Sequence, residues 1–196
     1  MMLRALALLG LLLPVSVAAD TASPRLAAAL SGDWNGDENP DAVLLYVHDD
    51  GMADLVLMES NGYEGLQEVL RLSQAVWSGT MAGMMPGIEP RSETSFAIRS
   101  EQTGIGRTPW YQWVTVAWRN GGYVVAGYDY SFYDRLDLSH HGDCSVNLLN
   151  GRFTLSLGPG DEAAEVHREG ATDEAAFPLA ELTDGWQARA CFALFQ

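Results

Sequence analysis

Short apolar runs separated by turn dipeptides constrain this chain more than any other feature. Runs rich in β-branched and aromatic residues occupy 42–47, 55–58, 94–100, 110–119, 123–130, 144–149 and 152–157. Asp-Gly at 50–51, Asn-Gly-Gly at 120–122 and Asn-Gly at 150–151 lie between successive runs. Such pairs favour the tight turns of β-hairpins. The pattern therefore predicts a mainly β fold with antiparallel neighbours, arranged as a sheet, a sandwich or a barrel.

The remaining segments give weaker signals. Residues 66–77 fit a helical face through Leu66, Leu70 and Gln74, but Leu66, Leu70 and Leu72 also alternate with polar residues, and we favour a strand. Gly, Met and Pro predict a loop at 79–90. Small and acidic residues predict an exposed loop at 158–172.

One or two short helices are expected near the ends of the domain. Ser23 and Pro24 suit the N-cap and first turn of a helix over 25–31, and Gly32 suits its end. A second short helix is expected at 178–183, before Gly185. Because 20–196 contains no regular repeat and no long linker, we expect a single β-rich domain.

Residues 1–19 have the layout of a secretory signal peptide. Arg4 precedes an apolar run over 5–13, and Val17, Ala18 and Ala19 provide small residues before Asp20. The run is too short to span a bilayer, and no Cys follows it to carry a lipid anchor. The alternative is a buried N-terminal helix. The signal predicts a periplasmic or secreted protein without a membrane anchor.

The charge of the chain excludes one large class of partners. The formal net charge is −15, and Arg supplies every permanent cation because no Lys occurs. Loss of Arg4 with the leader changes the charge from −15 to −16. Such a surface repels phosphate backbones and anionic lipid, so nucleic acid is not an expected partner. It suits a protein that attracts cations.

Two cysteines, Cys144 and Cys191, are expected to form a disulfide. An isolated even pair in an exported protein is typical of a disulfide, because the compartment is oxidising. The alternative is two buried thiols. A metal pair is less favoured, since neither Cys lies in a C-x-x-C motif.

The most specific constellation is the acidic loop, residues 33–41, with the sequence DWNGDENPD. Oxygen-bearing side chains occupy alternate positions, namely Asp33, Asn35, Asp37, Asn39 and Asp41. Calcium binds about six to eight oxygens, and alternate spacing in a tight loop can turn them toward one centre. The loop is no EF-hand, because Leu44 stands where that motif has its bidentate Glu. The alternative is an Asx-rich turn that needs no ion.

Residues 32–37 and 40–44 resemble the loop and following strand of FG-GAP and VCBS-type repeats, which are the calcium loops of β-propellers. The resemblance implies calcium as cofactor. It implies side-chain ligands at Asp33, Asn35, Asp37 and Asp41 and a carbonyl ligand at Asn39. Glu38 departs from the family, which has Gly after the third ligand, at a position where φ is often positive. A single copy of the loop does not make a propeller.

A second resemblance covers residues 105–107, Trp110, 127–129 and 145–151. These segments are similar to a group of uncharacterised exported proteobacterial proteins, whose members often carry the same acidic loop near their start. The resemblance implies no activity.

Aromatic residues crowd the hairpin that starts at residue 110. Trp110, Trp113, Trp118 and Tyr128 form a possible ligand face, since aromatic platforms bind sugars and peptides. The alternative is that these residues build the core. The first hypothesis is thus an exported, non-catalytic β-rich protein with one structural calcium loop. The second is a periplasmic module that binds or inhibits a glycan or protein partner through this face.

A hydrolase is the third hypothesis. The sequence contains no G-x-S-x-G, H-E-x-x-H or P-loop motif. His140 and His141 are adjacent, so on a strand they point to opposite sides and do not share one ion. Carboxylates are abundant, but their spacing nominates no catalytic pair.

We predict that the exported protein begins at Asp20, because the residues before it satisfy the small-residue rule of signal peptidase sites. Intact mass spectrometry of the periplasmic or culture fraction should show loss of residues 1–19. Exported protein that retains Met1 would contradict this prediction.

Overall fold

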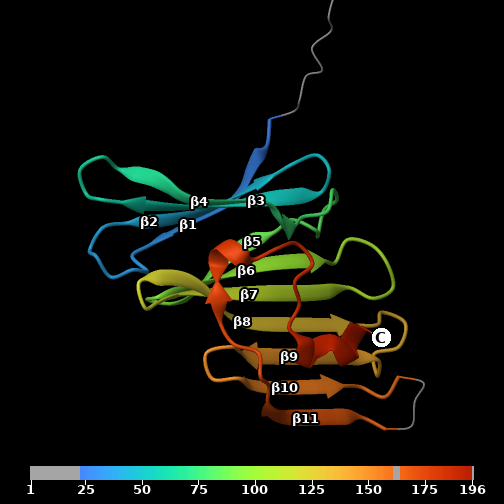
Figure 1. The fold of residues 1–196 in the computed structure, drawn as a ribbon. Coiled ribbons are helices and arrows are strands. Elements are labelled where there is room, and N and C mark those ends of the chain that lie inside the picture. The colour runs from blue at the N-terminus through green and yellow to red at the C-terminus, as the bar shows by residue number, and fades with distance from the viewer. Residues whose placement is uncertain (1–22, 161–163, 196) are drawn as a thin grey trace, which may run out of the picture.

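The computed structural model describes residues 23–160 and 164–195, so the expected signal peptide lies outside the described residues. The described chain forms two antiparallel sheets, which Figure 1 shows one above the other. The smaller sheet has the strand order β1-β2-β3-β4. The larger sheet has the order β11-β10-β9-β8-β7-β6-β5, with β12 paired to β8 as its eighth strand. The predicted mainly β class is confirmed.

The elements have the following bounds. The smaller sheet contains β1 (Arg25–Gly32), β2 (Asp41–Val47), β3 (Met52–Ser60) and β4 (Leu66–Trp77). The larger sheet contains β5 (Gly87–Ser92), β6 (Ser95–Gln102), β7 (Trp110–Arg119), β8 (Gly122–Tyr133), β9 (His141–Asn147), β10 (Arg152–Leu157), β11 (Val166–Ala171) and β12 (Phe177–Pro178). Two 3-10 helices, η1 (Leu179–Glu181) and η2 (Arg189–Phe195), lie near the C-terminus.

The turn dipeptides form the hairpin turns predicted for them. Gly51, Gly121 and Gly151 have φ values of 86°, 83° and 71°, a region that glycine occupies without steric cost. They connect β2 to β3, β7 to β8 and β9 to β10 as antiparallel neighbours. The strand preferred for 66–77 is confirmed as β4, and the short helix expected at 178–183 is confirmed as η1.

The helix predicted over 25–31 is wrong, because this segment is β1. It pairs with β2 from Arg25 opposite Val47 to Gly32 opposite Asp41. Ala and Leu favour helices, but a helix of this length is marginal without packing. Here the pairing with β2 supplies the backbone hydrogen bonds, and Ala28 and Leu30 pack against the core.

The loops predicted at 79–90 and 158–172 are each partly wrong. Strand β5 begins at Gly87, inside the first of them. Residues 166–171 form β11, which pairs with β10 and is the last strand of its sheet. Its exposed charged residues, such as Arg168 and Glu169, suit an edge strand because they discourage further pairing. Because these residues are charged, the sequence of this segment did not indicate a strand.

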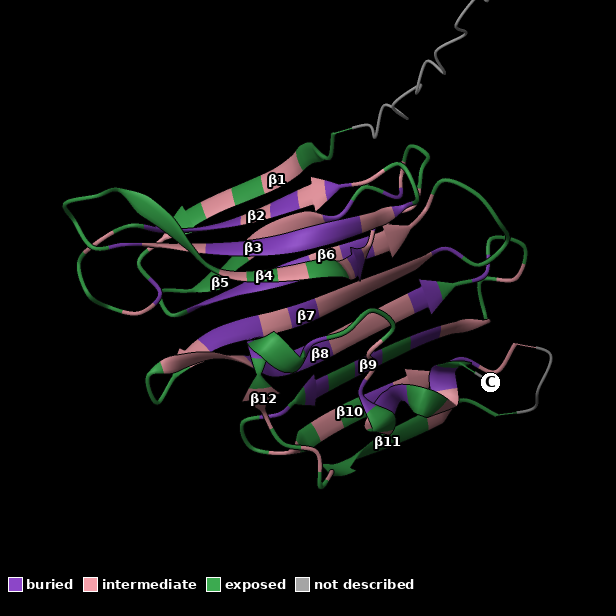
Figure 2. Ribbon diagram, turned by 45° about the horizontal axis from the view of Figure 1, so that its top comes forward, coloured by how far each residue is buried: buried purple, intermediate pink, exposed green. Residues whose placement is uncertain are grey.

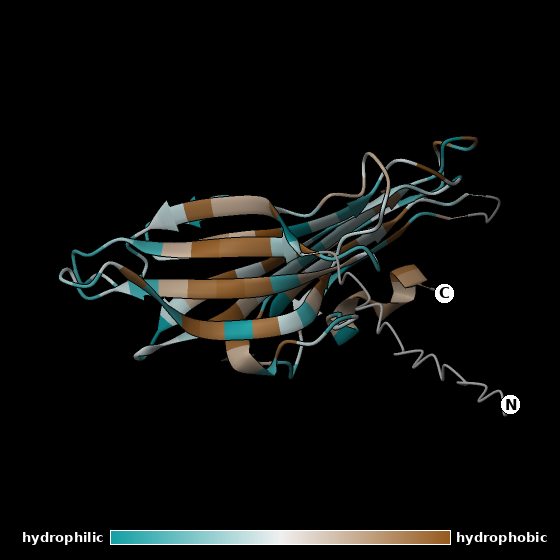
Figure 3. Ribbon diagram, turned by 90° about the horizontal axis from the view of Figure 1, so that it is seen from above, coloured by the Kyte–Doolittle hydropathy of each residue, from teal (hydrophilic) through white to brown (hydrophobic). Residues whose placement is uncertain are grey.

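Both sheets contribute to one hydrophobic core. Figure 2 shows buried residues concentrated on the central strands and exposed residues on the loops. The smaller sheet contributes residues such as Leu45 and Leu55, and the larger sheet contributes Phe96 and Val116, all four with 0% exposure. Figure 3, seen from above, shows hydrophobic stretches along the strands of the smaller sheet and hydrophilic residues at their ends. The core therefore lies between the sheets.

The C-terminal segment covers part of the larger sheet (Figure 1). Helix η1 contacts β8, and η2 contacts β9 and β10. The predicted disulfide between Cys144 of β9 and Cys191 of η2 is confirmed and fixes this segment to the sheet. The disulfide is consistent with an oxidising, extracytoplasmic location. Among the described residues, no helix has the length and apolar character needed to cross a membrane.

We predict that removal of the disulfide strongly destabilises the domain. The bond closes a loop of 47 residues, for which the chain-entropy model gives roughly 4 kcal/mol. For a domain of this size, the melting temperature of the Cys144→Ala/Cys191→Ala protein should fall by about 8 to 16 °C. Reduced wild-type protein is the matched comparison. Equal melting temperatures for oxidised and reduced protein would refute the prediction.

Candidate metal centre

The acidic loop joins β1 to β2, and its second residue, Trp34, is part of the core. The Trp34 side chain lies 4.8 Å from Phe96 between ring centroids and is only 3% exposed. It also covers Gly32, where an added Cβ would lie 2.7 Å from the indole ring. In the sequence, Trp34 stands between the predicted ligands Asp33 and Asn35. A large aromatic residue inside an acidic run was the available signal that the loop is attached to the core.

The last residue of the loop, Asp41, is a buried carboxylate with 0% exposure. Its Oδ2 accepts hydrogen bonds from the Trp34 backbone N–H at 3.1 Å and from the Tyr123 hydroxyl of β8 at 2.9 Å. Its Oδ1 has no hydrogen-bond partner in the structure. Burial raises the pKa of Asp41, although the Tyr123 and Trp34 bonds oppose the rise. The loop thus ends in a carboxylate that retains one unpartnered acceptor inside the protein.

The other predicted ligands shape the interior of the loop. The two oxygens of Asp33 accept hydrogen bonds from three backbone N–H groups, those of Gly36, Asp37 and Glu38. The carboxylate of Asp37 accepts from the Asn39 backbone N–H and the Asn35 side-chain amide. Since an ionised carboxylate offers about four lone-pair sites, Asp33 and Asp37 keep acceptor capacity beyond these bonds.

Glu38 adopts a left-handed backbone conformation, which glycine would adopt more readily. Its φ is 67°, in the left-handed region that residues with a Cβ rarely occupy. This conformation costs roughly 1 kcal/mol relative to glycine. The Glu38 N–H donates to Asp33 at 3.0 Å, so the hydrogen bonds of the loop hold the strained residue in place.

Glu59 of β3 joins the cluster from outside the loop. The pairing of Ala42 with Met58 places Glu59 beside Asp41 at the same end of the ladder. Burial raises the pKa of Glu59, and the charges of Asp41 and Asp37 raise it further. Sequence reasoning missed Glu59 because only the register of β2 with β3 brings it near the loop.

The negative charge of this cluster has no permanent counter-charge nearby. None of the ion pairs among the described residues involves Asp33, Asp37, Asp41 or Glu59. Carboxylates that repel one another favour a bound cation or a proton. A cation bound at this end of the smaller sheet would therefore reduce the repulsion among these carboxylates.

The donor set fits a hard cation, although the described side chains do not form a ready-made site. In the described part of the chain, no three His, Cys, Asp or Glu side chains converge closely enough to hold a metal ion. The loop offers oxygen donors only, which suits calcium. Among the described residues, two buried side-chain oxygens lack a hydrogen-bond partner, Asp41 Oδ1 and Gln102 Oε1, and the first of them belongs to the loop.

The aromatic residues proposed as a ligand face lie on both sides of the larger sheet. Trp110 and Gln112 line a pocket on the inner face of β7, whereas Trp113 points to the outer face and donates to Glu89 at 3.1 Å. Trp118 packs edge-on against Tyr123, with 4.9 Å between ring centroids. The fourth residue, Tyr128, is fully buried. The structure therefore does not bring the four together on one surface.

Two further buried carboxylates belong to ion pairs. Asp54 lies 3.2 Å from Arg71 and 2.9 Å from His48, and the three residues join the strands of the smaller sheet. Asp134 lies 2.6 Å from Arg107, and this hydrogen bond holds the pKa of Asp134 well below its usual range. Both carboxylates stabilise chain segments through charge pairing.

Comparison with known proteins gives no match. No family model, no curated protein sequence and no solved structure matches the chain. The resemblance of the acidic loop to FG-GAP and VCBS repeats consequently rests on the loop residues themselves.

We predict that Tyr123→Phe destabilises the domain. The substitution removes one of two donors to a buried carboxylate, and a hydrogen bond to a charged group contributes roughly 1.5 to 3 kcal/mol. The melting temperature in EDTA should fall by about 3 to 12 °C. The loss should shrink at acidic pH, because protonation of Asp41 turns the lost bond into a weaker neutral one.

Tyr111→Phe is the matched control, since Tyr111 lies on the outer face of β7 beside Trp113. It should leave the melting temperature within about 1 °C of the wild type. Equal changes in melting temperature for the two substitutions would show that the hydrogen bond from Tyr123 to Asp41 does not stabilise the domain.

Proposed function

We propose that this protein acts in the periplasm or outside the cell as a non-catalytic β-rich domain, stabilised by one calcium ion in the acidic loop. The observation that carries the proposal is Asp41 Oδ1, a buried carboxylate oxygen with no hydrogen-bond partner. An unsatisfied buried acceptor costs free energy, and a bound cation would offset that cost.

The ligands would come from the loop itself. Side-chain oxygens of Asp33, Asn35, Asp37 and Asp41 and the carbonyl oxygen of Asn39 would hold the ion. Calcium would supply the positive charge that the cluster of acidic residues lacks. Asp33 and Asp37 would bind the ion through the lone pairs that their hydrogen bonds within the loop leave free.

The position of the loop supports a structural role. Asp41 accepts a hydrogen bond from Tyr123 of the larger sheet, and Trp34 inserts into the core shared by both sheets. An ion at this point would therefore stabilise the packing of the two sheets. The signal peptide predicted at residues 1–19 and the Cys144–Cys191 disulfide support the exported location in this proposal.

We predict that calcium raises the melting temperature of the mature protein. If the dissociation constant is about 0.1 mM, as for many extracellular sites, then about 1 mM calcium contributes roughly 1.4 kcal/mol. That gain corresponds to a rise of about 3 to 6 °C. Melting curves in EDTA, calcium and magnesium measure it, and magnesium should do little because it requires a smaller octahedral site.

Variants make this experiment specific to the loop. Asp37→Ala should abolish most of the calcium-dependent rise, whereas Asp49→Ala, in an exposed turn, should preserve it. Glu38→Gly should strengthen binding, because glycine adopts the positive φ without strain. Identical melting curves in all three conditions, with no heat of calcium binding by calorimetry, would reject the proposal. The acidic loop would then be an Asx-rich turn that binds no ion.

A further inference from the structure

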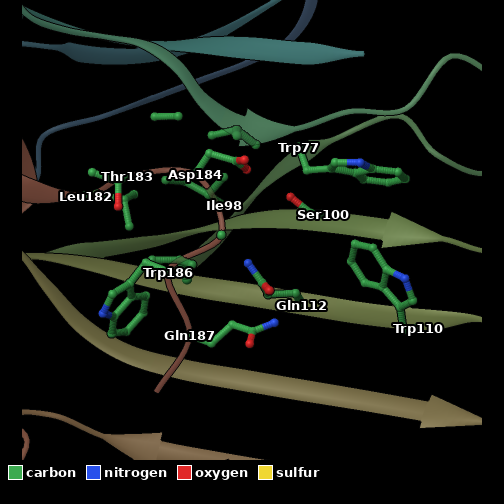
Figure 4. Close-up of a pocket in the computed structure, with 14 residues that line it drawn as sticks. Trp77, Ile98, Ser100, Trp110, Gln112, Leu182, Thr183, Asp184, Trp186 and Gln187 are labelled. Atoms are coloured by element: carbon green, nitrogen blue, oxygen red, sulfur yellow. The ribbon is translucent and has the colours of Figure 1, made fainter. Parts of the chain in front are cut away.

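A pocket of about 230 Å³ lies between the inner face of the larger sheet and the C-terminal segment. Strands β4, β6 and β7 form its floor and one end, and residues 182–187 form its rim (Figure 4). The pocket is smaller than the roughly 300 to 1,000 Å³ typical of sites for drug-sized ligands. Its size suits one small ring, with attached groups extending toward solvent.

Tryptophan side chains stand at both ends of the pocket. Figure 4 shows Trp77 and Trp110 at one end and Trp186 at the other. The rings of Trp77 and Trp110 have centroids 5.1 Å apart, and Trp186 packs edge-on against Tyr128 at 5.4 Å. All three tryptophans are only half-buried, so indole surface remains available to a ligand. Aromatic surface of this kind stacks on the C–H face of a small ring.

Polar groups lie between the aromatic ends. Figure 4 shows Gln112, Gln187 and Ser100 in the middle of the pocket. The Tyr128 hydroxyl donates to Gln112 Oε1 at 3.1 Å, which fixes the amide and leaves its N–H₂ group as a donor. Burial raises the pKa of Tyr128, so the phenol stays neutral and keeps this role. The pocket therefore offers amide and hydroxyl groups to a ligand rich in hydroxyls.

The charges of the residues that line the pocket disfavour some classes of ligand. Asp184 is the charged residue of the lining, and no Arg or His accompanies it among the described lining residues. Together with a net charge of −15, this disfavours phosphorylated or acidic ligands. The tryptophans stand at opposite ends instead of surrounding one point, which disfavours the aromatic cage that binds quaternary ammonium ions.

We propose that this pocket binds a neutral saccharide, with one sugar ring between the tryptophans and its hydroxyls on Gln112, Gln187 and Ser100. The site uses Trp110, one member of the aromatic face expected from the sequence, but adds Trp77 and Trp186 from distant segments. The inference goes beyond the proposed calcium-stabilised domain, because none of the acidic-loop residues lines the pocket.

Isothermal titration of the mature wild-type protein with maltotriose, cellotriose and chitotriose tests the proposal. At least one trisaccharide should bind saturably, with a change in tryptophan fluorescence. Trp110→Ala should weaken that binding by about tenfold or more, as loss of a central aromatic contact does. Gln187→Ala should also weaken it, and this variant tests the proposal if Trp110→Ala fails to fold, because Gln187 is not part of the hydrophobic core.

Trp113→Ala is the matched control, since Trp113 lies on the same strand but on the outer face. It should bind the trisaccharide as the wild type does. Glucuronic acid and choline should not bind. Lack of binding by all three trisaccharides overturns the proposal, as does choline binding that depends on Trp110. Saccharide binding lost in Trp113→Ala but kept in Trp110→Ala would place the site on the outer face and also overturn it.

Discussion

A buried carboxylate links the two sheets by a hydrogen bond across their shared core. Asp41 begins β2, and the Tyr123 hydroxyl of β8 donates to it across the interface. Burying a charged group is costly unless donors or cations compensate it. Two donors satisfy Oδ2, whereas Oδ1 stays unpartnered. The fold thus places a carboxylate with one unpartnered oxygen where the loop, the core and both sheets meet, and the calcium proposal follows from that cost.

A second constraint acts at the C-terminus. The Cys144–Cys191 disulfide holds η2 on β9, and β12 adds two residues of pairing to β8. Together they keep the chain that includes Trp186 against the inner face of the larger sheet. Without these attachments the pocket would lose its rim, because residues 182–187 belong to no sheet. Such a covalent link persists in an oxidising compartment, and the disulfide is consistent with an extracytoplasmic location.

Local signals in the sequence predicted most of the fold but little of either site. Turn dipeptides predict the hairpins because a positive φ at glycine determines the turn locally. They do not predict β1. Its Ala-rich sequence favours a helix, but pairing with β2 overrides this local preference. The acidic loop was visible as a motif, but Tyr123 and Glu59 reach it only through strand register and sheet packing. The pocket could not be predicted either, because its three tryptophans come from separate segments that only the packing of the chain brings together.

Strand β8 connects the two candidate sites through an irregularity in its pairing. Tyr123 lies opposite Trp118 and Tyr128 opposite Val114, so both tyrosines project to the inner face. In a regular strand, residues five apart would point to opposite faces. The register shifts between Thr115 and Val116, which leaves one extra residue on β8 and restores the common direction. One bulge therefore lets a single strand supply a hydroxyl to Asp41 at the acidic loop and another to Gln112 in the pocket.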